Sequence, residues 1–413
     1  MAPPSGRPAV VLAALASAAL AVAAAYEGPR TFQASEVLKP SQVKGPHFQV
    51  AATVPTEAYF HLFSISTDYG PLEAEGKSLL LTRINEVRAL GELDEVSKSE
   101  VFLKAAGTSV VNVGKGAAAA VKDPGATAKG VGGGLKRFGT NLGRKAKRAS
   151  EDAVDSDKKD EGQHKSAADT AGGVANSVLG VSAASRRWAQ KVGVDPYTTN
   201  PVLKKALEDI GKVDKAGGIA AKVVMPIPPV VSSTATVGNL VWGKDPEALL
   251  KYNEQRLKEL GASADVIKAL YLSKGFTLSL QTRLVNGLYA VKAKGSAAYA
   301  ETAAEADLER EAVFFAESAE MLQRFHASSP VVELLPDSRA LVAKTKDGRA
   351  VVLLPVDSVR WTEPFDKASA QVAERAKKEL GAAKLELRLT GAASPSAKKE
   401  LAARGWNVVE NVP

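Results

Sequence analysis

The chain contains few of the residues that most often carry chemistry. Its 413 residues include no cysteine, and its four histidines are His47, His61, His164 and His326. The lack of cysteine excludes disulfides, thiolate nucleophiles, zinc–thiolate sites and iron–sulfur clusters from this chain. His47 and His61 lie in stretches with strand-like alternation, where we expect solvent-facing positions. We therefore predict no metal site and no cofactor.

The short motifs of nucleotide-binding proteins and serine enzymes are incomplete. A phosphate-binding loop needs Gly-Lys followed by Ser or Thr, whereas residues 114–116 are Gly-Lys-Gly. The dinucleotide fingerprint fails over residues 130–135, because leucine stands in place of the third glycine. Residues 180–184 keep one of the two glycines that flank a nucleophilic serine. The sequence therefore identifies no catalytic residue.

One polar cluster is a candidate ligand site at a corner between two predicted helices. Residues 195–200 supply a carboxylate, a phenol, two hydroxyls and an amide, and two arginines precede them. Helical bundles form pockets at such corners. The alternative is a loop whose polar groups cap helix ends. The candidate ligand-binding residues here are Asp195, Tyr197, Asn200, Arg186 and Arg187.

A second candidate site follows the strand predicted over 385–389. Thr390, Gly391 and Ser394 lie between the carboxyl end of this strand and the amino end of the next helix. Small anions bind at this position in open α/β sheets. The alternative is again structural, because a serine directly before Pro395 is a common helix cap.

A row of carboxylates, Glu301, Glu305 and Glu309, recurs every four residues within a helix predicted over 297–327. Acid–base catalysis needs a partner group at a defined distance, and the sequence locates none. We therefore predict a solvated helix face.

The most unusual segment is rich in glycine, alanine and basic residues. Residues 115–150 contain nine basic side chains and one acidic side chain, Asp123. Their net charge of +8 equals the formal net charge of the whole chain. The following residues, 151–161, carry six acidic and two basic side chains and read as a solvated linker. The candidate contacts to membranes or other anions are Lys115, Lys122, Lys129, Lys136, Arg137, Phe138, Arg144, Lys145, Lys147 and Arg148.

Three interpretations of this basic segment remain open. An apolar stripe through Leu135 and Phe138, together with lysines every seven residues, suits a helix on an anionic membrane surface. The nine glycines between residues 114 and 143 oppose a stable helix. Contact with an envelope partner or with the acidic linker, or a plain flexible linker, are the alternatives. Nucleic-acid binding is disfavoured, because the segment offers one aromatic residue for stacking.

The first 25 residues have the pattern of a secretory signal peptide. Arg7 is the single charge, residues 9–25 are apolar except for Ser17, and small residues near 21–25 suit signal peptidase. We expect cleavage before Ala24 or Tyr26 and a periplasmic or secreted mature protein, with peripheral membrane association as one option. A lasting anchor is disfavoured, because this run is short and mostly alanine.

The remaining chain predicts a multidomain α+β protein. Strand alternation over 47–75 precedes a helical period over 77–103, residues 167–329 carry helical signals, and strands and helices alternate after 331. Asp347-Gly348 marks a hairpin, and the last two strands are expected to be parallel. The predicted units are a signal peptide (1–25), a small α+β hairpin and helix module (26–106), the basic segment and acidic linker (107–166), an all-α helical bundle (167–330) and a small α/β domain (331–413).

These observations leave two classes of function. The first is an exported, non-enzymatic cell-envelope protein whose basic segment contacts anionic membrane surfaces or a partner protein. The second is a periplasmic, hydrolase-like enzyme with a site near the Asp195–Asn200 loop. The missing catalytic motifs favour the first class.

Overall fold

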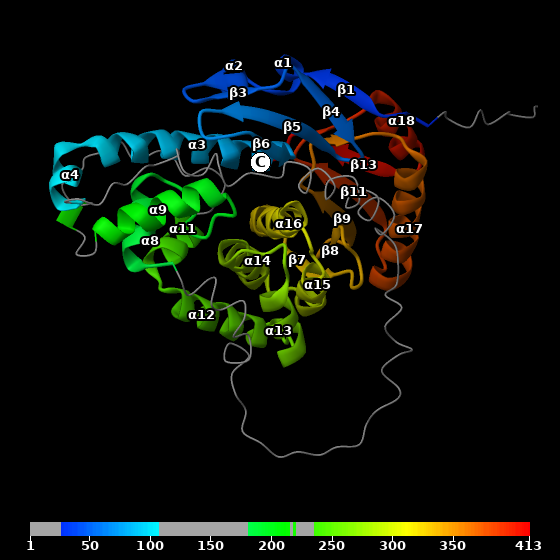
Figure 1. The fold of residues 1–413 in the computed structure, drawn as a ribbon. Coiled ribbons are helices and arrows are strands. Elements are labelled where there is room, and N and C mark those ends of the chain that lie inside the picture. Colours follow the sequence, from blue (N-terminus) through cyan, green and yellow to red (C-terminus); the bar gives the residue numbers. More distant parts are fainter. Residues whose placement is uncertain (1–25, 107–180, 215–217, 220–234) are drawn as a thin grey trace, which may run out of the picture.

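The computed structural model describes residues 26–106, 181–214, 218–219 and 235–413 (Figure 1). The predicted signal peptide, the basic segment from Lys115 to Arg148 and the acidic linker lie outside the described residues. Residues 167–180, the first part of the region with helical signals, also lie outside the described residues, and the first helix described there begins at Ala183. Within the part of the chain that is described, no helix is both long and apolar enough to cross a bilayer.

An antiparallel sheet is formed by the N-terminal residues. Its strand order is β1-β4-β5-β3-β2, and β6 also pairs with β5. Phe63 and Ile65 of β5 are buried while Ser64 and Ser66 are exposed, because successive strand residues point to opposite faces. The elements are β1 (Arg30–Gln33), α1 (Ala34–Val37), α2 (Pro40–Val43), β2 (Lys44–Gly45), β3 (Phe48–Val50), β4 (Thr53–Glu57), β5 (Phe60–Thr67) and β6 (Leu72–Glu75).

The helix predicted over 77–103 is present as α3 (Lys77–Lys98) and α4 (Glu100–Ala106). It follows Gly76, whose φ of 94° few other residues adopt. Leu80, Val87 and Leu90, which are seven and three residues apart and so share one helix face, are buried against the N-terminal sheet and helix α9 (Pro201–Val213). Figure 1 shows α3 lying between this sheet and the helices that follow.

Several central helices begin at a residue whose side chain caps the helix. The Asn200 side chain accepts hydrogen bonds from the backbone nitrogens of Val202 and Leu203. Asp245 and Ser263 cap two further helices in the same way. The helices are α8 (Ala183–Lys191), α9 (Pro201–Val213), α11 (Ala235–Gly243), α12 (Pro246–Glu259), α13 (Ala264–Leu272), α14 (Leu278–Val291), α15 (Ser296–Ala303) and α16 (Glu309–Ser328).

The single helix predicted over 297–327 is wrong, because α15 ends at Ala303 and α16 begins at Glu309. The loop between them packs on another segment: Gly275 donates its backbone N–H to the Ala306 carbonyl, and the Ser273 hydroxyl donates to the same oxygen. These hydrogen bonds replace the helical ones. The carboxylate row is therefore divided, with Glu301 and Glu305 exposed and Glu309 paired with Arg83.

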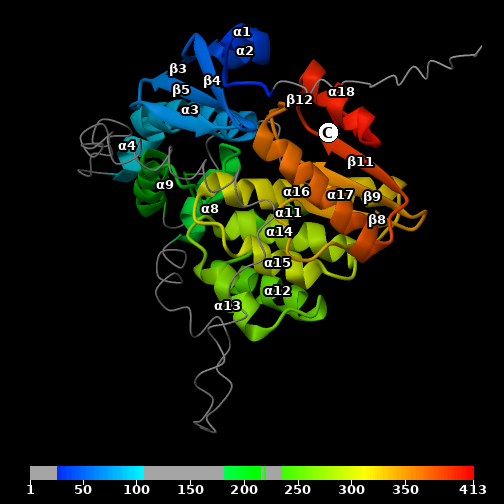
Figure 2. The same cartoon turned by 90° about the vertical axis from the view of Figure 1, so that its right-hand side faces the viewer.

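The C-terminal residues form a five-stranded mixed sheet in the order β13-β11-β9-β8-β7. The predicted hairpin at Asp347-Gly348 is confirmed, and so is the parallel pairing of β11 with β13. Figure 2 shows α17 and α18 on the outer side of this sheet, and α16 packs on its other face. The elements are β7 (Val331–Leu334), β8 (Leu341–Thr345), β9 (Arg349–Leu354), β10 (Ser358–Val359), α17 (Glu363–Leu380), β11 (Lys384–Leu389), β12 (Ala392–Ala393), α18 (Pro395–Ala403) and β13 (Trp406–Val409).

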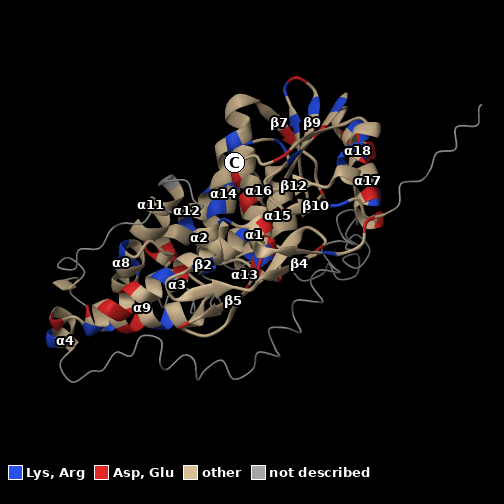
Figure 3. Ribbon diagram, turned by 90° about the horizontal axis from the view of Figure 1, so that it is seen from above, with Lys and Arg blue, Asp and Glu red and all other residues tan. Residues whose placement is uncertain are grey.

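The described residues thus mix helices with several sheets, as the predicted α+β class requires. The hydrophobic clusters run across the predicted units. One joins Trp188 and Leu203 of the helical region to the N-terminal sheet, and another joins Tyr59 to α14, α16 and the C-terminal sheet. The division into separate domains stays a prediction. Figure 3 shows basic and acidic residues interspersed along the ribbons of α3, α4 and α9.

Candidate ligand-binding site

A cavity of about 770 Å³, here called the large cavity, opens between the N-terminal sheet, α3 and α16. The segments that follow β9 and β11, together with Asn411 and Pro413 after β13, complete its lining. Side chains from distant parts of the chain therefore meet at one place. The ionisable residues in its walls are Glu36, His61, Glu75, Lys77, Arg310, Glu317, Glu320, Arg324 and Asp357.

Helix α16 lines the large cavity along one face. Its lining residues recur every three or four positions, which is the period of a single helix face. Charged residues alternate along this face with apolar ones. The charged residues include both positive and negative side chains. The residues are Arg310, Val313, Phe314, Glu317, Glu320, Met321 and Arg324.

Asp357 fixes the wall at the point where α3 begins. Its carboxylate accepts the backbone N–H of Lys77 at 3.1 Å and that of His61 at 2.9 Å. Since Lys77 is the first residue of α3, Asp357 supplies the capping group that Gly76 lacks. Burial raises the pKa of Asp357, and these hydrogen bonds oppose the rise.

Arg310 and Glu75 form an ion pair across the large cavity wall. The Arg310 side chain is 5% exposed, and its Nη1 donates to Glu75. Its Nε and Nη2 atoms are buried and have no hydrogen-bond partner among the described residues. Burial raises the pKa of Glu75, while the ion pair lowers it. A guanidinium with unused donors at a cavity wall is a site that an anionic group can occupy.

Glu317 is a carboxyl in the wall of the large cavity with a strongly raised pKa. Burial raises its pKa to about 7, although Arg283 and the Ser78 hydroxyl, which donates to Oε1, both lower it. Near neutral pH the group therefore exists in both protonation states. It can accept a hydrogen bond as a carboxylate or donate one as an acid.

A second, smaller cavity of about 120 Å³ borders the 195–200 loop. Asp195 lines it and accepts hydrogen bonds from the Ser279 hydroxyl at 2.6 Å and the Tyr197 backbone nitrogen at 2.8 Å. Burial raises the pKa of Asp195 to about 6, against the effect of these donors. Leu79 and Val313 line both cavities and so lie between them.

Arg283 connects the two cavities electrostatically. It lines the small cavity, and its Nε and Nη2 donate to the two carboxylate oxygens of Glu320, in the wall of the large cavity, at 2.8 and 2.9 Å. Its Nη2 also lies 3.8 Å from Glu317. These carboxylates hold the pKa of Arg283 above its ordinary value, so it stays charged.

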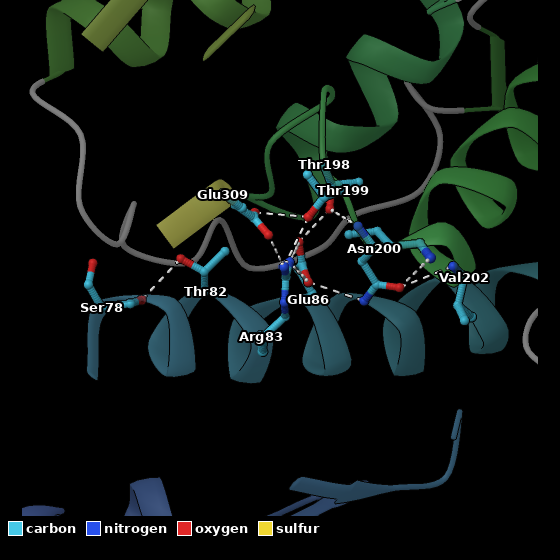
Figure 4. A network of polar contacts seen from close by, with 10 residues as sticks. Ser78, Thr82, Arg83, Glu86, Thr198, Thr199, Asn200, Val202 and Glu309 are labelled. Carbon is cyan, nitrogen blue, oxygen red and sulfur yellow. Dashed lines mark hydrogen bonds and ion pairs between the residues drawn. The ribbon is translucent and has the colours of Figure 1, made fainter. Parts of the chain in front are cut away.

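A polar network next to the small cavity holds the 195–200 loop on α3 (Figure 4). Arg83 donates to Glu86 at 3.0 Å, to Thr199 at 2.9 Å and to Glu309 at 2.5 Å. Glu86 in turn accepts from the Asn200 side chain at 3.1 Å. The network joins α3, the loop and α16, so it fixes the wall of the small cavity.

The first candidate cluster of the sequence is only partly brought together. Asp195 lines the small cavity, whereas Asn200 caps α9. Tyr197 is buried in an apolar cluster, which raises the pKa of its phenol to about 12. Arg186 and Arg187 donate to the backbone carbonyls of Val181 and Asp214. Neither arginine lines the small cavity or the large one.

The second candidate cluster borders the large cavity. Thr390 and Gly391 line it, and a Cβ at Gly391 would overlap the carbonyl oxygen of Asp357. Only glycine therefore permits the close approach of these two loops. Ser394 caps α18 by accepting from Ala397, and its hydroxyl donates to Glu27 at 2.5 Å. Binding of a ligand by Thr390 or Gly391 stays a prediction.

The charged residues of α16 and α14 were not identified from the sequence. Glu317, Glu320 and Arg310 lie on the inward face of α16. Charged residues on the inward face of a helix are the signal that could have identified them. The predicted exposure of His61 is wrong: it is buried, with its ring 5.1 Å from that of Phe32 and 5.9 Å from that of Phe63. Burial lowers the pKa of His61.

Within the described residues, no group of three or more His, Asp or Glu side chains is arranged to hold a metal ion. Comparison of the chain with protein-family models, curated proteins and solved structures finds no match. The chemistry of the two cavities therefore has to be interpreted from their own side chains.

Proposed function

We propose that this chain is an exported, non-enzymatic cell-envelope protein that binds a small polar molecule in the large cavity. The observation that supports binding is the convergence of ionisable side chains from five separate regions on a cavity of about 770 Å³. This volume is in the range of small-molecule sites, about 300–1,000 Å³. Buried ionisable groups cost stability, so a cavity that collects them is better explained by binding than by folding.

The cellular part of the proposal rests on the sequence. The pattern of residues 1–25 supports export, and the charge of +8 between residues 115 and 150 supports contact with an anionic membrane surface or with an envelope partner. In this proposal the basic segment holds the protein at the envelope, and the folded part binds the ligand.

Ligand binding is tested by thermal unfolding of the mature chain with a panel of small carboxylates, phosphates, amino acids and sugars. A molecule that binds the folded state raises the midpoint of unfolding. The substitution Leu81→Trp fills part of the large cavity, because Leu81 lines it. The matched control is Leu103→Trp, at a side chain that is 56% exposed. We expect at least one compound to stabilise the wild type and the control but not Leu81→Trp. Equal responses of all three proteins contradict binding in the large cavity.

Membrane contact is tested by co-sedimentation of the mature chain with anionic and neutral vesicles at two salt concentrations. The variant replaces the nine basic residues between 115 and 148 by glutamine. The wild type is expected to bind anionic vesicles, and more weakly at high salt. The variant is expected not to bind them. Equal binding to both lipids, or to neither, contradicts membrane contact and leaves a protein partner as the target to test.

A second candidate function is a hydrolase-like activity at the small cavity. The observation that favours it is the distance of 2.6 Å between Ser279 Oγ and Asp195, whose pKa of about 6 suits a general base near neutral pH. Hydrolysis of p-nitrophenyl acetate by the wild type, lost in both Asp195→Asn and Ser279→Ala, would support this activity. Equal rates in the three proteins would exclude that reaction at this pair.

A further inference from the structure

Arg310 is the most unusual group in the large cavity wall, because only one of its nitrogens has a partner. Nη1 donates to Glu75, whereas Nε and Nη2 are buried without a hydrogen-bond partner among the described residues. A buried donor without an acceptor is destabilising, and the effect is larger for a charged group. The arrangement is therefore costly to the free protein.

The unused Nε–Nη2 edge is the one that binds a carboxylate through two parallel hydrogen bonds. Two other arginines of this protein use it in this way. Arg283 binds Glu320 at 2.8 and 2.9 Å, and Arg375 binds Glu379 at 2.7 and 3.0 Å. The corresponding edge of Arg310 has no such carboxylate from the described chain.

A second group on the same helix face suits the other end of a ligand. Glu317 follows Arg310 by seven residues, or two helical turns, which places their backbones roughly 10 Å apart along the helix axis. Its carboxyl lines the large cavity and is 17% exposed. The helix therefore places a cationic and an anionic side chain two turns apart in the wall of the large cavity.

The other charges around Glu317 favour a ligand that carries both signs. Arg283 of α14 and Glu320 of α16 form their own pair, and Ser78 of α3 donates to Glu317. Asp357 accepts from two backbone nitrogens, and Glu75 faces Arg310 from β6. A simple dianion would meet several carboxylates in this cavity, whereas a dipolar molecule can match both Arg310 and Glu317.

We propose that the ligand of the large cavity is a small dipolar molecule with an anionic carboxylate or phosphate group at one end and an amine or hydroxyl group at the other. The anionic group takes the Nε–Nη2 edge of Arg310, and the amine or hydroxyl donates to Glu317. This inference rests on the proposed binding function. Nε and Nη2 of Arg310 are buried, so binding requires that the groups covering them move.

The test is an NMR titration of the mature chain that follows the Nε–H resonance of Arg310. The resonance is assigned by its loss in Arg310→Lys. The probes are 5-aminopentanoate, which is dipolar, pentanoate, which carries only the anion, pentylamine, which carries only the cation, and inorganic phosphate. The control variant is Arg375→Lys, which alters the same kind of pair on α17, away from the large cavity.

We expect 5-aminopentanoate to shift the Arg310 resonance and to bind more tightly than pentanoate. Arg310→Lys should weaken this binding about tenfold through the loss of one charge-assisted hydrogen bond, and Arg375→Lys less than about twofold. A shift with phosphate alone would identify phosphate as the anionic group. An Arg310 resonance that neither carboxylate nor phosphate moves overturns the inference. If a compound of the thermal panel still binds in a Leu81-dependent manner, the proposed binding function survives. If no compound of the panel binds in this way, both the proposed binding function and the inference about the ligand are contradicted.

Discussion

Arg283 and Glu320 form a bidentate ion pair between the small cavity and the large one. Both side chains are mostly buried, with 12% and 6% of their surfaces exposed. Such a pair is costly to break, because the remaining partner keeps an uncompensated charge away from water. The pair therefore links the stability of the protein to the electrostatics of both cavities.

The substitution Glu320→Gln should lower the free energy of unfolding by about 3–5 kcal/mol, because Arg283 loses its principal partner. It should also lower the pKa of Glu317, since Glu320 raises that pKa and Arg283 lowers it. Denaturant unfolding at neutral pH measures the first effect. The control is Glu379→Gln in the more exposed pair with Arg375, where a loss below about 1 kcal/mol is expected. Equal losses in the two variants would contradict this role of the buried pair.

The pH dependence of stability should carry the signature of Glu317. Its pKa is raised from 4.5 to about 7 in the folded state, so the folded chain binds more protons than the unfolded chain between these values. The stabilisation is complete below about pH 4.5 and is lost as the pH rises through 7, by up to about 3 kcal/mol. Glu317→Gln should flatten this slope in urea unfolding curves measured from pH 4.5 to 8. The exposed control Glu301→Gln should leave it unchanged. An unaltered slope in Glu317→Gln would show that other groups cause it.

Helices α14 and α16 approach each other closely at Gly287. A Cβ at this position would lie 2.7 Å from the backbone of Ala319, so Gly287→Ala should destabilise the fold by about 1–3 kcal/mol. The control is Gly243→Ala at the end of α11, where a Cβ meets no atom within 4 Å. Thermal unfolding should show a lower midpoint for the first variant and a nearly unchanged one for the second. The reverse order would mean that the two helices are not packed as described.

Glu27, close to the predicted signal cleavage site, joins the segment before β1 to Trp361 and Ser394. Its carboxylate accepts from the Trp361 backbone nitrogen at 2.6 Å and from the Ser394 hydroxyl at 2.5 Å. Glu27→Ala should therefore destabilise the mature chain by about 1–3 kcal/mol, since it leaves these donors without their acceptor. Glu73→Ala, at an exposed position of β6, should change stability by less than about 0.5 kcal/mol. Chemical denaturation of the two variants at the same pH makes the comparison.

The local features of the fold could be predicted from the sequence because they depend on neighbouring residues. The caps at Asn200 and Asp245 and the hairpin at Gly348 each need only a few adjacent side chains. The candidate site could not be predicted from the sequence, because the residues that pair there are far apart in the chain. Arg310 and Glu75 are 235 residues apart, and Arg283 and Glu320 are 37 apart. From the sequence alone, a charged residue on a helix is expected to be solvated, because the packing of that helix is not known. Glu309, which was expected on a solvated helix face, is an example.

Native mass spectrometry of this protein, recovered from the exported fraction of its own cells, tests export and ligand binding together. We expect the mass of a chain that begins at Ala24 or Tyr26, with the added mass of one small molecule. That added mass should disappear on denaturation and should be absent from Leu81→Trp but present in Leu103→Trp. Recovery of only the full-length chain from the cytosol would contradict export. Identical native and denatured masses for the exported wild type would contradict a ligand bound in the large cavity.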